Sequence, residues 1–477
     1  MRYETVIGLE VHAQLATKSK LFCGCATTFG SPPNSQCCPV CLGLPGSLPV
    51  MNRRAFELAV KTALALNCKI ARRTWSDRKN YYYPDLPKNY QISQNSSLLG
   101  TEGCVEIQAD GKPKRIRINN VHLEEDAGKL MHGHEHGASY SVVDLNRTGI
   151  PLAEIVTEPD MSSAAEAEAY MYALRSILEY TEVSDCKMQE GSLRFEASIS
   201  LRPEGTERLG SRVEIKNLNS IKAVVRSLQY EIQRQASVLD SGRQVEMETR
   251  LWDDDLGRSE KMRSKEEAQD YRYFPEPDLM DLAVDVAWLE AIRSELVELP
   301  QARRSRFVDQ YQLSDYDASV ISADRAVADY FEAVAASGIE AKQAANWVMS
   351  GVLRTIKEKR ISVSEFPISP RRLADLLKII RAGAITTTIA RGVFERMLED
   401  KREPGEIIST QGLSQISDTS ELEAIIDEVF KANPKAVEDY RAGNKNTLNF
   451  LKGQVMRQTR GKANPRVIAQ LLAQKLS

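Results

Sequence analysis

The chain has 477 residues, of which 42% are hydrophobic and 27% charged, and it carries a net charge of −3. This composition is typical of a soluble globular protein, and the length suggests about three domains at roughly 150 residues each. No apolar run reaches the ~20 residues that cross a bilayer, and residues 1–15 lack the pattern of a signal peptide. These features argue against a membrane protein and predict a cytoplasmic one.

The first predicted strand covers residues 3–15, where apolar and polar side chains alternate. Its polar face carries Glu10 and His12, so a carboxylate lies beside an imidazole. A helix is predicted next at residues 53–66, where apolar side chains recur at helical spacing.

Between these elements lie four of the eight cysteines, in the pairs Cys23-x-Cys25 and Cys38-x-x-Cys41. Two thiolate pairs can close a tetrahedral zinc site, and four thiolates leave no open position for catalysis. We therefore expect a structural zinc ion. Buried free thiols or reversible oxidation are the alternatives. Cys37 could in principle replace its neighbour Cys38 as a ligand.

Residues 76–94 show neither helical nor strand periodicity, and Pro84 and Pro87 exclude a regular helix. The stretch combines cations suited to phosphate with flat aromatic faces. These side chains are Arg78, Lys79 and Lys88, and Tyr81, Tyr82, Tyr83 and Tyr90. By itself the pattern is as typical of a rigid surface loop as of a substrate pocket.

Further strands are predicted at residues 105–125, 140–145, 187–201, 213–218 and 245–252, with a hairpin turn at Asp110-Gly111. Two helices interrupt them. The first, at residues 163–180, opens with a capping box, and the second covers residues 221–239.

Acidic side chains recur on three of these strands as Glu10, then Glu124 and Glu125, then Glu190. Clustered carboxylates repel one another unless a cation lies among them, and magnesium prefers oxygen ligands and commonly bridges carboxylates to phosphates. The set predicts a magnesium site, although each residue alone is as typical of a surface acid. Alternation pairs Glu124 with His122 and leaves open whether Glu124 or Glu125 points inward.

Other patterns limit the interpretation. His132, His134 and His136 lie between glycines and are interpreted as a hairpin tip rather than a metal site. The sequence has no G-x-x-x-x-G-K-[ST] loop, no G-x-G-x-x-G after a strand and no G-x-S-x-G elbow. Any nucleotide therefore binds outside those folds, and no hydrolase nucleophile is evident.

Beyond residue 289 the strand pattern ends. Helices are predicted at 300–312, 323–336, 341–358, 370–382 and 386–399, followed by a linker at 401–405 and a smaller unit with helices at 447–460 and up to Leu476. The predicted class is α+β, with domains at 1–293, 294–405 and 406–477. From Lys431 onward ten basic residues face two acidic ones, a net +8 that leaves −11 for the rest, so a polyanion is the expected partner of the tail.

Several ordered stretches carry a resemblance that covers essentially the whole chain. They begin at Val6 (VIGLEVH), Cys38 (CPVCLGLPGSLPV), Asp77 (DRKNYYYPDLPKNYQISQ), Glu124 (EEDAGK), Val143 (VDLNRTGIPLAEIVTEPD), Glu190 (EGSLR), Glu214 (EIKNLNS), Asp270 (DYRYFPEPD) and Gly461 (GKANP). By these stretches the chain closely resembles the B subunits of tRNA-dependent amidotransferases, which convert glutamyl-tRNA(Gln) or aspartyl-tRNA(Asn) to the amide.

The resemblance implies a cradle-shaped α+β catalytic domain, a helical domain and a small helical tail that contacts tRNA. It also implies that ATP phosphorylates the side-chain carboxylate of the mischarged aminoacyl-tRNA and that ammonia then displaces the phosphate. An amidase-like A subunit would supply the ammonia from glutamine through an internal channel, and a small C subunit would brace the pair. The need for a partner glutaminase agrees with the missing nucleophile.

Carried onto this sequence, Glu10, His12 and Glu125 resemble the family's magnesium cluster, with Glu124 and Glu190 as close candidates. We add a group of expected contacts to phosphate or to the aminoacyl end, which are Lys79, Arg147, Lys88, Tyr81, Tyr82 and Tyr83. The four cysteines resemble the zinc-bearing forms of the family, and other members lack them, which favours a stapling role.

The chain departs from the family pattern at Gln189, where a glutamate is frequent, and at Cys37. The first departure favours Glu190 as the magnesium ligand, and the second favours Cys38 as the zinc ligand. Two other interpretations remain open, a zinc-stapled tRNA-binding scaffold without chemistry and a self-sufficient amide ligase that uses free ammonia. For the tail we expect salt-sensitive RNA contacts through basic side chains. These are Lys445, Lys452, Arg457, Arg460 and Lys462.

Overall fold

The computed structural model describes residues 2–135, 138–264, 270–413, 419–441, 444, 447–459, 463 and 465–476. The chain divides into two compact units, Met1–Gln301 and Ala302–Ser477, and each is considered by itself. Among the described residues, none of the helices combines the length and the apolar character that a membrane crossing requires.

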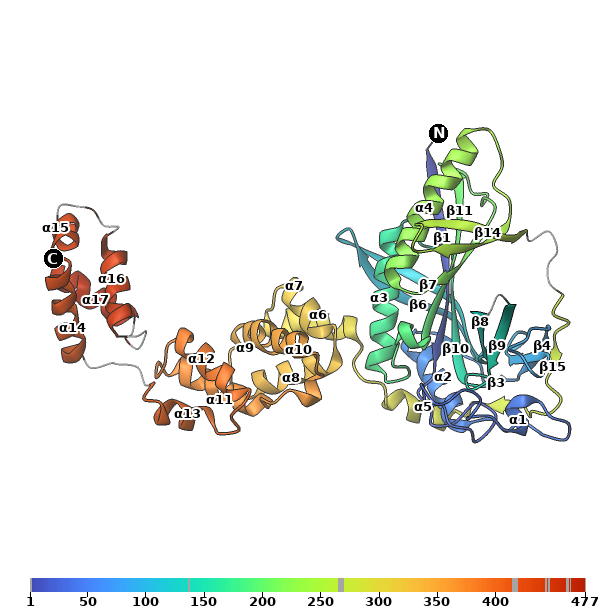
Figure 1. Cartoon of the computed structure of the whole chain (residues 1–477), viewed down its shortest axis with the longest axis horizontal. Coiled ribbons are helices and arrows are strands. Elements are labelled where there is room, and N and C mark those ends of the chain that lie inside the picture. Colours follow the sequence, from blue (N-terminus) through green and yellow to red (C-terminus); the bar gives the residue numbers. More distant parts are fainter. Residues whose placement is uncertain are drawn as a thin grey trace. The chain divides into compact units, whose positions relative to one another are not determined.

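The first unit is built on a nine-stranded sheet with the strand order β14-β13-β12-β11-β1-β10-β7-β6-β2 (Figure 1). Its central strand β1 pairs antiparallel with β10 on one side and β11 on the other, whereas β12 and β13 are parallel. The strands are β1 (Tyr3–Gln14), β2 (Lys69–Ile70), β6 (Gly100–Ala109), β7 (Lys112–Glu125), β10 (Pro151–Thr157), β11 (Leu193–Pro203), β12 (Val213–Leu218), β13 (Glu248–Asp253) and β14 (Arg258–Ser264).

Three helices cover the apolar face of this sheet, namely α2 (Arg53–Ala65), α3 (Ala164–Tyr180) and α4 (Ile221–Asp240). In β1 the alternation predicted from the sequence is confirmed, because Ile7, Leu9 and Val11 are fully buried in the same core as these helices. Burying one such side chain contributes about 1.5–3 kcal/mol. The opposite face of β1, with Glu10 and His12, is left for a site.

Most predicted helices and strands of this unit are present, with one shift that matters for the site. Residues 105–125 form a hairpin, β6–β7, with its turn at Asp110-Gly111 as predicted. Residues 187–201 do not begin as a strand, because η1 (Met188–Glu190) is a 3-10 turn that ends at Gly191 with φ of 80°. The strand β10 was not predicted.

The stretch 76–94 differs from the expected irregular segment. Its ends form two strands, β4 (Asp77–Asn80) and β5 (Tyr90–Ser93), which pair with each other and, on the far side of β4, with β15 (Phe274–Pro275). Pro84 and Pro87 lie in the connection, where no ladder hydrogen bond is lost. Strands this short carry too few residues for a visible alternation.

Smaller elements complete the unit. They are α1 (Pro39–Leu42), β3 (Arg73–Thr74), β8 (Lys129–Glu135), β9 (Ala138–Asp144), β16 (Leu282–Ala283) and α5 (Val286–Ser294). In the predicted hairpin tip, His132 and His134 lie within β8, which pairs with β9. His136 and the side chains of His132 and His134 lie outside the described residues.

The second unit is helical, as predicted, and contains two separate hydrophobic clusters. The first is formed by α6 (Pro300–Tyr311), α7 (Asp315–Ser322), α8 (Arg325–Ala336), α9 (Ala341–Trp347), η2 (Val348–Leu353), α10 (Arg354–Lys359), η3 (Val363–Glu365), α11 (Pro370–Arg381), α12 (Thr387–Met397) and α13 (Pro404–Thr410). The second is formed by α14 (Thr419–Ala432), α15 (Pro434–Arg441), α16 (Thr447–Gln458) and α17 (Pro465–Leu476).

Two predictions in this unit need correction. The single helix at 341–358 contains a π-helical turn, η2, where Gly351 packs so closely on Phe394 that an added Cβ would lie 2.9 Å from the ring. Residues 401–405 are not simply a linker, because Pro404 begins α13 and the buried Ile407 and Ile408 join the first cluster. Proline suits the first turn of a helix, so its presence marks a start here.

Candidate active site and metal centre

The polar face of the large sheet carries a cluster of acids and imidazoles on three adjacent strands. In the register of β1, β10 and β7, Glu154 stands opposite His12 on one side and His122 on the other. Since successive side chains of a strand alternate in direction, Glu124 shares this face with His122. Pairing order therefore brings together residues more than a hundred positions apart.

The polar atoms of this cluster form two overlapping groups, each close enough to hold one cation. His12 Nε2 lies 3.4 Å from Glu124, 3.5 Å from Glu154 and 3.6 Å from Glu10. His122 Nε2 lies 3.2 Å from Glu154. In each of two groups, Glu10–His12–Glu154 and His122–Glu124–Glu154, one atom per residue lies within 4.8 Å of the others.

Burial and the neighbouring charges shift the pKa values of the side chains in this cluster. Burial, reinforced by the charge of Glu154, raises the pKa of Glu124 to about 7. Burial lowers the pKa of His12, but its hydrogen bond to Glu154 and the charge of Glu124 outweigh burial and raise that pKa to about 9. The two imidazoles together hold the pKa of Glu154 well below its usual range against its burial. A cluster of this kind is prepared to exchange protons for a cation.

A cleft of about 490 Å³ lies over the cluster, and cationic and aromatic side chains line its sides. Lys79 on β4, Tyr81 and Tyr273 line the cleft, and Lys79 Nζ lies 4.9 Å from the centre of the Tyr271 ring. Burial lowers the pKa of Lys79, but the charge of Glu124 outweighs it and keeps the ammonium protonated. The cleft therefore offers both a cation site and a fixed positive charge.

Arg194 adds a second cation to the floor of the cleft. It stands opposite His12 in the sheet, and its Nη2 donates to Asp126 Oδ2 at 3.0 Å. Its Nε is buried and, among the described residues, finds no hydrogen-bond partner. Gln14 Nε2 also donates to Asp126, at 3.2 Å.

Several residues predicted from the sequence face elsewhere. Glu125 is buried with 2% exposure, forms an ion pair with Lys88 and accepts from the Ile92 backbone N–H at 2.9 Å. Both side chains line a separate small cavity beside Cys41, and neither lines the cleft. The question left open by alternation is thus answered in favour of Glu124 as the residue that shares the cleft with His12.

The remaining predicted residues also do not line the cleft. Arg147 donates to the backbone carbonyls of Ala127 and Gly128, and its Nε lies 3.7 Å from Asp126 Oδ2. Glu190 pairs with Lys187 at 3.1 Å, outside the cleft. Tyr82 and Tyr83 are 84% and 56% exposed, so of the three consecutive tyrosines only Tyr81 lines the cleft.

Four members of the site were not predicted from the sequence, namely Glu154, Asp126, Arg194 and Tyr273. Each lies within a stretch that carries the family resemblance, but a motif does not show which of its residues converge. The sequence held one further indication of Glu154. It is a single carboxylate within the short apolar run at residues 151–157, and such a run is typical of a buried strand.

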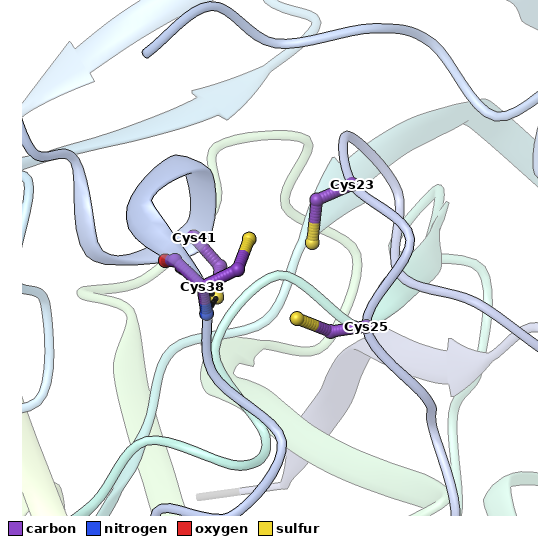
Figure 2. A group of neighbouring side chains, drawn as sticks. All are labelled: Cys23, Cys25, Cys38 and Cys41. Atoms are coloured by element: carbon purple, nitrogen blue, oxygen red, sulfur yellow. Dashed lines mark hydrogen bonds between the residues drawn. The ribbon is translucent and has the colours of Figure 1, made fainter. Parts of the chain in front are cut away.

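The four cysteines predicted to bind zinc lie together at one side of the first unit. One sulfur from each of Cys23, Cys25, Cys38 and Cys41 lies within 4.8 Å of the others, and Figure 2 shows the pairs facing each other from two segments. Cys37 is not in this group. The backbone N–H of Cys38 donates to Cys41 Sγ at 3.1 Å.

The surroundings of these thiols favour negative charge on Cys41 and disfavour it on Cys23 and Cys25. A hydrogen bond from Cys23, opposed by burial and aided by the Cys38 backbone, lowers the pKa of Cys41 to about 4. Burial raises the pKa of Cys25 to about 11, and the bond to Cys41 raises that of Cys23 still further. Four sulfurs within 4.8 Å of one another fit a tetrahedral divalent metal, which binds cysteine as the thiolate.

A catalytic domain with a two-histidine acidic cluster, followed by helical clusters, agrees with the comparison with known families. A family model described as the GatB/GatE catalytic domain matches residues 5–290, and one described as the GatB domain matches residues 329–476. The chain belongs to this family, the B subunits of aspartyl/glutamyl-tRNA(Asn/Gln) amidotransferases.

Curated relatives from this family match along their whole length. The chain is 53% identical over 476 residues to the B subunit of the aspartyl/glutamyl-tRNA(Asn/Gln) amidotransferase of Moorella thermoacetica, covering 100% of both chains. It is 53% identical over 477 residues to the B subunit from Caldanaerobacter subterraneus subsp. tengcongensis, again covering 100% of both. The B subunit from Carboxydothermus hydrogenoformans is 51% identical, with 100% of this chain and 99% of the relative covered.

Proposed function

We propose that the chain carries the ATP-dependent step in the amidation of mischarged glutamyl-tRNA(Gln), aspartyl-tRNA(Asn) or both. In the first reaction a side-chain carboxylate oxygen attacks the terminal phosphorus of ATP, the bond to the bridging oxygen breaks and ADP leaves. In the second, ammonia attacks the activated carbonyl carbon, loses a proton and expels phosphate. Family membership and the cleft described above support this assignment, and a role on tRNA implies a cytoplasmic location.

The residues present fit a magnesium ion, which would be held by Glu10, His12, Glu124 and Glu154 and would neutralise charge on the phosphates. Among the described residues, the cations that line the cleft are Lys79, Arg194 and Lys216, and we assign Lys79 and Arg194 to orienting phosphate oxygens. Tyr81 and Tyr273 would restrict water at the reacting atoms. We leave Glu125, Glu190, Lys88 and Arg147 out of the proposed set, because their side chains do not line the cleft.

We propose that Cys23, Cys25, Cys38 and Cys41 hold a structural zinc ion. The fit rests on four sulfurs within 4.8 Å of one another and on the backbone donor at Cys41. Cys41→Ser should lose zinc from the purified chain, whereas Cys37→Ser is the matched control and should retain it. Equal zinc content in both variants, measured by mass spectrometry, would refute this ligand set.

The partners we propose are an amidase-like glutaminase A subunit, a small C subunit and mischarged tRNA. The division into a catalytic domain at 1–293, a helical domain at 294–405 and a tRNA-contacting tail at 406–477 is part of the same proposal, although α13 packs with the preceding helices. In the tail, Arg457 is an exposed cation and Lys452 a half-buried one.

The observation that carries the catalytic proposal is that Glu10, Glu124 and Glu154 each bring a carboxylate oxygen within 3.6 Å of His12 Nε2. The test uses the chain reconstituted with its partners and measures ADP formation that requires both mischarged tRNA and magnesium. His12→Ala and Glu154→Gln should abolish amidation while the glutaminase activity of the partner persists. Glu158→Gln, four positions further along and outside the cleft, is the matched control. Normal amidation by His12→Ala would favour the scaffold interpretation instead.

A further inference from the structure

Lys20 is a lysine buried completely within the first unit. Its side chain has an exposed fraction of 0%, which is unusual because lysine is almost never fully buried without a partner. Its Nζ lies 3.7 Å from Cys41 Sγ and 3.3 Å from the carbonyl oxygen of Leu145. Among the described residues, no carboxylate lies within ion-pair distance of this ammonium group.

The missing carboxylate has a physical consequence. An ammonium group taken out of water costs several kcal/mol unless an anion compensates it. One backbone carbonyl supplies only a dipole, and the Glu125 carboxylate in the same cavity is paired with Lys88, so the sulfur of Cys41 is the group that the Lys20 ammonium contacts directly. A zinc ion held by four thiolates remains an anion overall, and such sites are stabilised by charges and donors around the ligands.

Lys20 also connects the two cysteine pairs to each other and to residues 145–149. Its backbone N–H donates to the Cys25 carbonyl at 2.9 Å, while its side chain reaches Cys41 on the other pair. The adjacent Leu21 donates to Gly149, whose own N–H donates to the carbonyl of Asp126, both at 2.8 Å. Residues 145–149 thus lie between the thiolate group and the end of β7.

We infer that Lys20 is the counter-ion of the thiolate centre and that it ties this centre to residues 145–149, which support the acidic end of β7. Lys20 is a positioning residue here, since it acts through Cys41 and touches no substrate. The inference rests on the zinc part of the proposed function.

The test compares Lys20→Met with Lys18→Met in the full chain. Lys18 is exposed and two positions away, so it is a matched control for the loss of one charge. Competition with a chromophoric chelator should show that Lys20→Met binds zinc about 10–100-fold more weakly, the range for residues that support metal ligands. Lys18→Met should bind as the unmodified chain does. Equal zinc affinity in both variants would overturn the inference.

A spectroscopic signature separates a charge effect from loose packing. With cobalt in place of zinc, the sulfur-to-metal charge-transfer bands of Lys20→Met should move to lower energy, because the thiolates lose a neighbouring cation. An unchanged spectrum would overturn the inference. If the unmodified chain binds no zinc or cobalt at all, the zinc proposal itself fails, and the inference fails with it.

A third measurement needs no variant and so does not depend on how Lys20→Met folds. Amine labelling followed by peptide mass spectrometry should find Lys20 protected in the zinc-loaded chain and labelled after chelation. Lys18 should be labelled in both states. Equal protection of Lys20 with and without zinc would overturn the inference.

Discussion

Adjacent glutamates on β7 should respond in opposite ways to the same substitution. Glu125→Gln leaves the Lys88 ammonium, which is 6% exposed, without its carboxylate partner. Glu124→Gln instead removes a buried carboxylate that stands beside Glu154 in an acidic cluster. We therefore expect Glu125→Gln to lower stability, and Glu124→Gln to abolish ATP-dependent amidation with little change in stability.

The size of the effect follows from the size of the unit. Removing one partner of a buried ion pair costs about 3–5 kcal/mol. For a unit spanning Met1–Gln301, an unfolding entropy of about 2.1 cal/mol/K per residue gives about 0.6 kcal/mol/K. The expected fall in Tm for Glu125→Gln is therefore about 5–8 °C, against about 2 °C or less for Glu124→Gln.

Calorimetry of the two variants in the same buffer, with added chelator, tests this order. The double variant Glu125→Gln with Lys88→Met should recover at least half of the lost Tm, because it leaves no unpaired buried charge. A Tm for Glu125→Gln equal to that of the unmodified chain, or a larger fall for Glu124→Gln, would refute the assignment of the two carboxylates to opposite sides of the strand.

Three further outcomes are expected. Lys79→Met should lower the rate of amidation about 100-fold, which is the usual effect of removing one fixed donor to a developing charge. The exposed Lys112→Met should leave the rate unchanged. Equal rates for the two variants would show that Lys79 only lines the cleft. Removal of residues 443–477 should weaken tRNA affinity far more than ATP binding, and the salt dependence of the remaining affinity should become shallower. Burial raises the pKa of Glu332, but the hydrogen bonds from Arg306 and Arg303 outweigh burial and lower that pKa. These bonds therefore stabilise the folded state above the unfolded pKa of about 4.3, and this stabilisation is lost as pH falls through the folded pKa. The Tm of the helical unit should accordingly fall less between pH 5 and pH 3 in Glu332→Gln than in the unmodified chain.

Local patterns determined much of the architecture. Alternation in β1 identified which face is core and which is polar, because strand geometry sends successive side chains to opposite faces. The predicted bounds of α3 and α4 agree closely with the structure, since the capping box at Ser163 and the apolar spacing of both helices act within a few residues. The cysteine spacing likewise predicted a four-sulfur group whose members the structure brings together.

Short strands that are held by pairing with other strands were not predicted from the sequence. β4 and β5 are only four residues long, and they are held by pairing with each other and with β15, almost two hundred positions away. Pro404 signalled a break in the chain, but burial of Ile407 and Ile408 against the preceding helices made the same residues the start of α13. In both cases tertiary contacts decided the local structure.

The sequence by itself determined the family, the α+β class, the acidic and thiolate groups and the basic tail, because these depend on residue types at short spacing. Only the tertiary structure decided which acids meet. Strand order brings Glu154 between His12 and His122, and the direction of alternation sends Glu124 into the cleft and Glu125 to Lys88. A motif records neither strand order nor the pairing of a buried charge with a partner distant in sequence, and these two physical constraints define the site.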